Sequence, residues 1–222
     1  MPRYLVDLHL HSPASNCFSG SKTSLPEIIA AAKRKKLDAI AVTDHHSFDG
    51  FAGLKALGAR EGILVLPGVE LTCGLAGVEE VFILGIFDPG QPLKYLEKLL
   101  VELGVPRQAS GSGGFIIPRP VEEVIMKIGA LGGIAISSRI DKTEYRRAAI
   151  PELIKLGVRV FDVVFPEKTG EYFGGFKEYR AGELSFFTFS DSHEAGNTGR
   201  RFSSIELPAL EYTSFVEKLS KN

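Results

Sequence analysis

Two histidines stand one residue apart near the start of the chain, in VDLHLHSPASNC (residues 6–17). If this stretch is a strand, His9 and His11 share one face, because side chains at positions i and i+2 of a strand point the same way. Two imidazole rings aimed at one point are typical of a metal site, which needs further ligands from elsewhere. The spacing therefore predicts a metal centre that the rest of the fold must complete.

The other candidate ligands share one position, directly after an apolar run that has the pattern of a strand: Asp44, His45, His46, Glu70, Asp191 and His193. The carboxyl ends of parallel strands gather on one rim of a barrel or doubly wound sheet, where active sites are built. Neutral imidazole and carboxylate suit zinc, manganese or iron, and one carboxylate can bridge two ions. We expect one or two divalent transition-metal ions per chain at this rim.

Two of these residues have other candidate roles. Asp44 could orient His45 instead of binding a metal ion, as carboxylates beside ligating histidines often do. On a continuing strand His46 points away from His45, so we expect it to face solvent or substrate.

Apolar runs alternate with helical patterns along the chain. We expect strands at 4–9, 38–43, 63–71, 81–87, 132–137, 158–165, 184–190 and 202–207, and helices at 25–36, 51–62, 92–103, 121–131, 144–157 and 210–220. This alternation predicts an α/β fold with a mostly parallel sheet that is buried on both faces. The length of 222 residues, 44% of them hydrophobic, fits one domain over residues 1–222.

The composition disfavours several classes of protein. The net charge is −1, with basic and acidic residues balanced, so bulk binding to nucleic acid or a membrane surface is not expected. Only Cys17 and Cys73 occur, which favours a reducing compartment over a disulfide scaffold. We find neither a signal-peptide pattern nor an apolar run of transmembrane length, and we expect a cytoplasmic protein.

A stretch rich in Gly, Pro and Ser at 104–120 has two interpretations. It is either a flexible connection or a lid that carries Arg107 and Arg119 over an anionic ligand. We expect substrate specificity to lie in this stretch and in residues 166–183.

Five motifs, in this order, resemble those of the polymerase and histidinol phosphatase (PHP) family: VDLHLHS, AVTDHHSFDG, LPGVELT, GGIAIS and FSDSHEAG. The resemblance runs from residue 4 to about residue 200. It implies a distorted (β/α)7, TIM-like barrel with up to three metal ions at its rim. It also implies phosphoesterase chemistry, in which a metal-bound hydroxide hydrolyses a phosphoric ester.

The resemblance assigns four residues to a first metal site: His9, His11, Glu70 and Asp191. His45 and His193 match a second site, which the family completes with an Asp or His shortly after the HxH motif. Asn16 and Cys17 stand there in this sequence. A thiolate is the better zinc ligand, so we favour Cys17, with no third ligand as the alternative.

Two residues depart from the family pattern. Phe82 and Arg139 stand where the family usually has histidines. Phenylalanine cannot bind a metal ion, and arginine stays protonated in proteins. Both departures affect the ion that Glu70 would otherwise bridge, so one of the three family sites is expected to be lost. Arg139 could supply the missing positive charge by pairing with Glu70 or with a substrate phosphate.

We therefore expect a metal-dependent phosphoesterase that acts on a phosphorylated small molecule or nucleotide. The expected catalytic residues are Arg139, Asp191 and His193, and the expected substrate-binding residues are Arg139, Arg200 and His46. The alternative is a degenerate, non-catalytic member that binds a metal ion or a phosphorylated ligand in a regulatory role. An amidohydrolase would need further histidines on its middle strands, and none is left unassigned.

Overall fold

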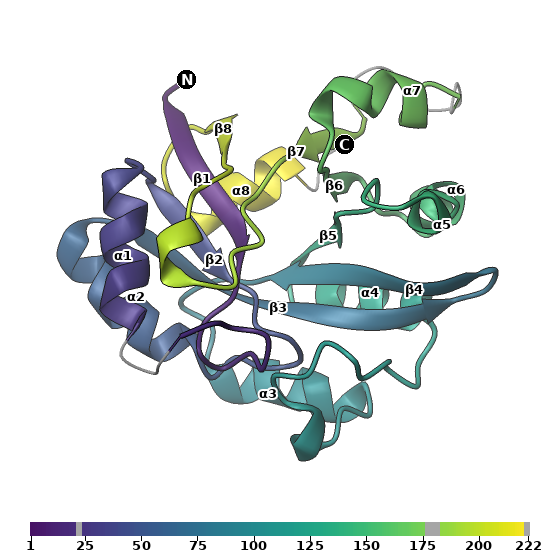
Figure 1. Cartoon of the computed structure of the whole chain (residues 1–222), viewed down its shortest axis with the longest axis horizontal. Helices are drawn as coiled ribbons and strands as arrows, with labels where there is room; N and C mark the ends of the chain where they lie inside the picture. The colour runs from purple at the N-terminus through teal and green to yellow at the C-terminus, as the bar shows by residue number, and fades with distance from the viewer. Residues whose placement is uncertain (21–23, 176–182, 220–222) are drawn as a thin grey trace.

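An eight-stranded sheet forms the centre of the computed structural model, which describes residues 1–20, 24–175 and 183–219 (Figure 1). In chain order the strands are β1 (Arg3–Leu10), β2 (Ala39–Val42), β3 (Leu64–Leu75), β4 (Val78–Ile86), β5 (Ile134–Ser138), β6 (Val160–Asp162), β7 (Ser185–Phe187) and β8 (Ser203–Glu206). Their order across the sheet is β7-β6-β5-β4-β3-β2-β1-β8. The sheet curls into a nearly closed barrel, as the resemblance implied.

Helices surround this sheet (Figure 1). They are α1 (Leu25–Arg34), α2 (Phe51–Glu61), α3 (Leu93–Glu102), α4 (Val121–Ala130), α5 (Glu144–Arg147), α6 (Ile150–Lys155), α7 (Thr169–Phe173) and α8 (Tyr212–Leu219), with short 3₁₀ helices η2 (Arg107–Ala109), η3 (Pro166–Lys168) and η4 (Ala195–Asn197). In the described part of the chain, no helix combines the length and the apolar character that crossing a bilayer requires.

The stretch that follows β7 closes the barrel against β1. The amide of Asp191 donates to the carbonyl of His9 at 2.8 Å, and the amide of His11 donates to the carbonyl of Ser192 at 2.9 Å. The fully buried carboxylate of Asp7 accepts from the amides of Ser190 and Gly199, both at 3.0 Å. These bonds bring two segments that lie far apart in the sequence to the same end of the barrel.

The strands are less regularly parallel than the alternation of runs predicted. The pairs β1–β2, β2–β3, β5–β6 and β6–β7 are parallel, but β4 is antiparallel to both β3 and β5. Only Ala76 and Gly77 separate β3 from β4, and so short a connection permits only a hairpin. Gly77 has a φ of 81°, which suits glycine in a tight turn.

Apolar side chains fill the barrel and leave the polar residues at one rim. The central cluster combines residues of the strands, such as Leu8, Leu66 and Ile136, with Tyr212 and Phe215 of α8. The hydroxyl of Tyr212 lies 2.8 Å from the carbonyls of Ile86 and Gly132. Helix α8 thus covers the end of the barrel near Ile86 and Gly132. The opposite rim is left for the polar side chains.

Candidate metal centre

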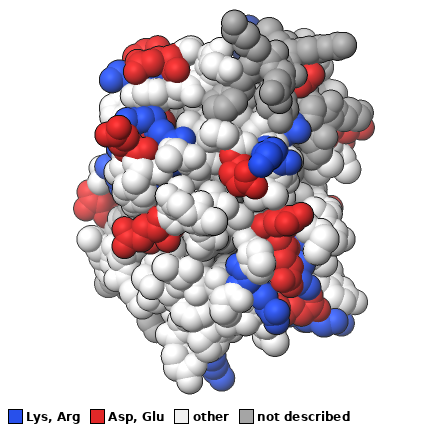
Figure 2. All heavy atoms as spheres, turned by 90° about the vertical axis from the view of Figure 1, so that its right-hand side faces the viewer, with Lys and Arg blue, Asp and Glu red and all other residues white. Residues whose placement is uncertain are grey.

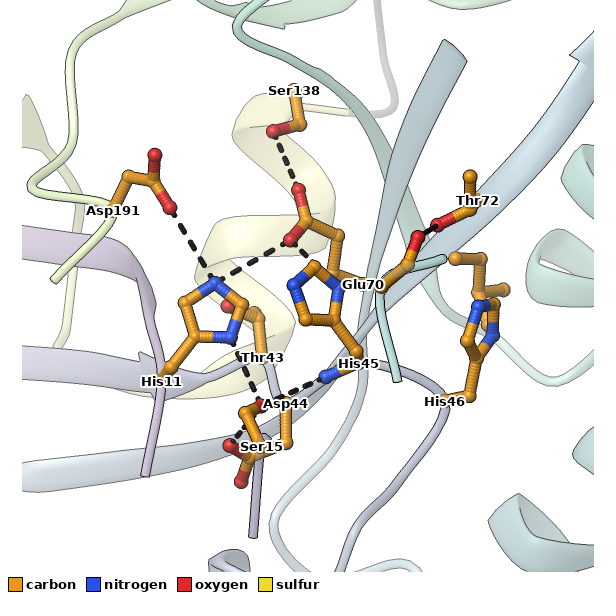
Figure 3. A network of polar contacts seen from close by, with 12 residues as sticks. His11, Ser15, Thr43, Asp44, His45, His46, Glu70, Thr72, Ser138 and Asp191 are labelled. Carbon is orange, nitrogen blue, oxygen red and sulfur yellow. Dashed lines mark hydrogen bonds and ion pairs between the residues drawn. The ribbon is translucent and has the colours of Figure 1, made fainter. Parts of the chain in front are cut away.

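Three histidines surround the carboxylate of Glu70, which is only 4% exposed, and Figure 3 shows two of them, His11 and His45. Glu70 Oε1 lies 3.4 Å from His9 Nε2, and Oε2 lies 3.4 Å from His11 Nε2. Oε2 also lies 3.3 Å from His45 Nδ1. The i, i+2 spacing of the first two histidines thus brings both rings to one carboxylate, and a second strand end supplies the third ring.

Asp191 lies on the other side of the first two histidines. Its Oδ1 lies 3.4 Å from both His9 Nε2 and His11 Nε2. Its Oδ2 lies 3.2 Å from Nε of Arg139. Asp191, Arg139 and His46 have φ angles of 47°, 44° and 49°, which non-glycine residues seldom adopt. Such strained residues cluster at functional sites, and here Arg139 directly follows β5, while His46 and Asp191 lie in the segments that follow β2 and β7.

These separations fit ligands that share an ion. Two ligand atoms that are each about 2.1 Å from a tetrahedral ion lie about 3.4 Å from one another. His9 Nε2, His11 Nε2 and His45 Nδ1 are buried and have no hydrogen-bond partner among the described residues, although buried polar atoms are normally paired. The positions of these nitrogen and oxygen atoms therefore fit a site that binds a metal ion.

Two overlapping groups could hold an ion. One consists of His9, His11 and Glu70, and the other of His11, His45 and His193, with the ligand atoms of each group within 4.8 Å of one another. Sequence analysis assigned His11 only to the first site, whereas the structure places it in both groups. The chain thus has histidine and glutamate clusters that could bind metal.

Buried partners hold these side chains in place. His9 Nδ1 bonds to Asp162 Oδ2 at 2.9 Å, and Ser138 donates to Glu70 Oε1 at 2.9 Å. Ser15 Oγ lies 3.1 Å from His11 Nδ1 and accepts from the amide of His45. Such contacts fix the ring orientation and the tautomer of a ligating histidine.

Asp44 acts through Ser15, whereas the sequence suggested that it orients His45 directly. Its carboxylate accepts hydrogen bonds from the Ser15 hydroxyl at 2.7 Å and from the amide of Ser12 at 2.8 Å. Asp44 therefore orients Ser15, and Ser15 in turn contacts His11 and the backbone of His45.

The histidines of the centre are of two kinds, which differ in the direction of their pKa shift. Burial lowers the pKa of His9 and His11, but the carboxylates of Glu70 and Asp191 more than offset it, so both pKa values are raised. Burial lowers the pKa of His45 to about 4, and burial followed by the charge of His11 also lowers that of His193. His45 and His193 are therefore neutral near pH 7, as metal ligands must be.

Two expected substrate-binding residues lie elsewhere. His46 does point away from His45, but it is 1% exposed and its Nε2 donates to the carbonyl of Phe115 at 2.9 Å (Figure 3). Its expected position facing solvent is therefore wrong, because residues 111–117 cover it. Arg200 is exposed, donates from Nε to the carbonyl of Ser190 and is not among the residues that line the cavity beside the centre.

Cys17 belongs to neither group of candidate ligands. Cys17 is exposed as a whole, but its sulfur is partly buried. This burial, together with the charges of Glu70 and Asp191, raises the pKa of the thiol to about 11. Asn16 is exposed too, and its amide donates to the carbonyl of Gly111. The structure thus places neither of them in the two groups, and His11 is the third residue of the group that contains His45 and His193.

The glycine-rich stretch contacts the centre through its backbone. Gly111 donates to the carbonyl of His45 at 2.7 Å, and Thr72 donates to the carbonyl of Gly113 at 3.0 Å. Arg107 and Arg119, expected on a lid, are exposed and are not among the residues that line the cavity at the centre. This stretch is therefore a fixed strap over His45 and His46. Of the other expected specificity segment, residues 176–182 lie outside the described part.

Some residues of the site could not be recognised from sequence. A cavity of about 200 Å³ beside the centre is lined by His45, Glu70, Phe82, Gly113, Ser138, Arg139, Lys142, Arg146, Asp191 and His193. Lys142 and Arg146 have no motif around them. Asp162 did carry a signal, because an acid within the apolar run VRVFDVVF needs a buried partner.

Comparisons with known proteins agree with the family that the sequence motifs suggested. Residues 7–108 match the model of the PHP domain. The expected resemblance to the PHP family is confirmed. A curated relative, the 3',5'-nucleoside bisphosphate phosphatase of Chromobacterium violaceum, is 34% identical over 119 residues, which is 49% of this chain and 40% of the relative. This chain thus spans less than half the length of that PHP-like relative.

Two solved structures share the fold over nearly the whole chain. A protein of Bifidobacterium adolescentis described as a metal-dependent phosphoesterase aligns with a TM-score of 0.66 and 16% identity, over 97% of this chain and 95% of that one. A lesion-specific endonuclease of Pyrococcus furiosus aligns with a TM-score of 0.70 and 14% identity, over 100% of this chain and 57% of that one. At these identities the likeness establishes the PHP-like fold alone.

The contact between Asp162 and His9 predicts an effect on metal binding. We expect Asp162→Asn to weaken metal affinity by about 10–100-fold, because the amide no longer favours the ligating tautomer of His9. A titration against a competing chelator measures this affinity. Asp141→Asn is the matched control, since Asp141 is equally buried but bonds the backbone amides of Val164 and Phe165. Equal metal affinity in the two variants would contradict the assigned role.

The strap predicts a second effect on the centre. A methyl group at Gly113 would lie 2.8 Å from His45 Nε2, so we expect Gly113→Ala to displace this ring. The group of His11, His45 and His193 should then lose its ion, while the group with His9 keeps one. Gly114→Ala is the control, because no atom lies within 4 Å of the added methyl. Elemental analysis that finds the same metal content in both variants would rule out this role of Gly113.

Proposed function

We propose that this chain is a metal-dependent phosphoesterase whose centre binds two divalent ions. The separations of about 3.4 Å among buried, unpartnered imidazole nitrogens and the oxygens of Glu70 and Asp191 support this proposal most strongly. The first ion would be held by His9, His11, Glu70 and Asp191, and the second by His45 and His193, because His11 has one free nitrogen, Nε2, and can serve one ion only. Imidazole and carboxylate ligands favour zinc, manganese or iron.

Bound ions at such a centre would activate water for attack on phosphorus and withdraw charge from the phosphoryl oxygens. The protein's part is to fix the positions of the reacting groups. Asp162 holds His9, Ser138 holds one oxygen of Glu70, and Asp44 holds Ser15. Ligands held by such contacts lose little conformational entropy when the substrate binds. The site is thus preorganised to stabilise the transition state.

Arg139 is proposed to bind the phosphoryl group of the substrate. Its side chain is 12% exposed, lines the cavity and is oriented by Asp191 through Nε. A guanidinium group presents donors in a planar fork that matches two phosphate oxygens. We also propose that Arg139 and Phe82 leave this chain with two ions where the family holds up to three.

A phosphorylated small molecule or nucleotide is the proposed substrate. The likeness to a nucleoside bisphosphate phosphatase supports this class, although this chain covers only part of that relative. Acidic and basic side chains alternate on the face drawn in Figure 2, without an extended basic surface of the kind that nucleic-acid binding needs. We propose a single PHP domain over residues 1–222 and a cytoplasmic location. Strands from β1 to β8 in one sheet support the first point.

A non-catalytic regulatory role is the weaker candidate. The centre has both of its acidic groups. Glu70 contacts His9 and His11, and Asp191 contacts His11. The likeness to a nucleoside bisphosphate phosphatase also supports hydrolysis over a purely regulatory role. Hydrolysis therefore accounts for more of the site.

Asp191→Asn tests the proposed activity. Asparagine tolerates the left-handed backbone of residue 191 but loses the charge that faces His9, His11 and Arg139. We expect hydrolysis of p-nitrophenyl phosphate and of a nucleoside 3',5'-bisphosphate to fall by about a hundredfold or more, with less metal bound.

Glu194→Gln is the control for this variant, since Glu194 is a nearby exposed acid that contacts Asn197. It should retain full activity and full metal content. A wild-type protein that binds two ions but hydrolyses neither ester would reject the phosphoesterase proposal. An Asp191→Asn variant that keeps both its metal and its activity would reject the assigned role of Asp191.

A further inference from the structure

The cavity beside the centre contains more positive charge than metal binding requires. Arg139, Lys142 and Arg146 line one side of it, and all three come from the short stretch between the end of β5 and α5. Its volume of about 200 Å³ is below the roughly 300–1,000 Å³ of pockets that enclose whole drug-sized ligands. A cavity of this size and charge suits the anionic end of a larger molecule.

Contacts with Phe82, Glu80 and the hydroxyl of Tyr145 hold the guanidinium group of Arg146 in place. It lies 4.4 Å from the centre of the Phe82 ring, and its terminal nitrogen lies 3.1 Å from Glu80 Oε1. The Arg146 side chain is 13% exposed and that of Glu80 is 26% exposed. A stacked and ion-paired arginine is preorganised, so little conformational entropy is lost when its remaining donors bind an anion.

Phe82 and Arg139 depart from the same part of the family pattern, and the structure shows how they are related. Phe82 pairs directly with Ser138 across β4 and β5, so it is a cross-strand neighbour of the residue before Arg139. One departure places the guanidinium of Arg139 in the cavity, and the other provides the ring that supports Arg146. One change thus supplies a positive charge, and the other supports a second positive charge, at the position where the family pattern has two histidines.

We propose that Arg139 and Arg146, with Lys142 beside them, form a phosphoryl-binding site that replaces the third metal ion. Arg139 Nε lies 3.2 Å from Asp191 Oδ2 in an ion pair, and the planar fork of the guanidinium group can still contact a phosphoryl oxygen. Lys142 is exposed and forms no ion pair with any other described residue. Phe82 and Glu80 are positioning residues for Arg146. The identity of the anion as substrate rests on the proposed phosphoesterase function, whereas anion binding itself does not.

Inorganic phosphate is the probe, and calorimetry on the full chain loaded with Mn²⁺ is the measurement. We expect Arg146→Ala to weaken phosphate binding by about tenfold or more, with unchanged metal content, because a charge-assisted bond is lost. Phe82→Leu keeps the apolar contact but removes the aromatic face, and should weaken binding by about two- to fivefold. Arg119→Ala, at an exposed arginine outside the cavity, should leave phosphate affinity unchanged.

Phosphate affinity that is equal in wild type and Arg146→Ala would overturn the inference, as would an equal loss in Arg119→Ala. Ester hydrolysis by the wild type is measured separately. Phosphate binding that depends on Arg146, in a protein that hydrolyses no ester, would support this site and reject only the phosphoesterase proposal. Hydrolysis with phosphate affinity unaffected by Arg146→Ala would reject only this site.

Discussion

The carboxylate of Glu70 is the group on which the rest of the centre depends. An ionised carboxylate that is 4% exposed is unstable unless positive charge or hydrogen bonds compensate for its lost hydration. His9 and His11 supply this compensation, and they also hold the pKa of Glu70 well below its usual value against the opposing effect of burial. The same oxygens and nitrogens can exchange protons for metal ions, so one arrangement stabilises the protein and prepares it for metal binding.

Closure of the barrel brings the second acidic group to this centre. The backbone bonds between β1 and residues 191–192 fix Asp191 beside His9 and His11. Asp7 ties the same segments together from within the fold. Metal binding should therefore stabilise the closed barrel, because a ligand that binds only the folded state favours it by mass action.

Local patterns in the sequence predicted which histidines meet at the centre. Contacts between segments that lie far apart in the sequence determine the other parts of the site. The i, i+2 spacing of His9 and His11 follows from strand geometry alone, so it could be recognised without a structure. The contact of Arg146 with Phe82 depends on how α5 packs on β4, which no local pattern encodes. Arg200 follows the last motif closely in sequence, yet it bonds to the backbone of Ser190 and does not line the cavity. The antiparallel β4 was equally hidden, since its apolar run has the same pattern as its parallel neighbours.

Metal content per chain is the most direct test of a two-ion centre with guanidinium groups in place of a third ion. Elemental analysis would compare the wild type with Arg139→His and with the double variant Phe82→His/Arg139→His, all purified without chelator. The account predicts two ions in the wild type and in the single variant, and three in the double variant. A wild type that binds no ion even after reconstitution would contradict the account, and so would a third ion gained through Arg139→His alone.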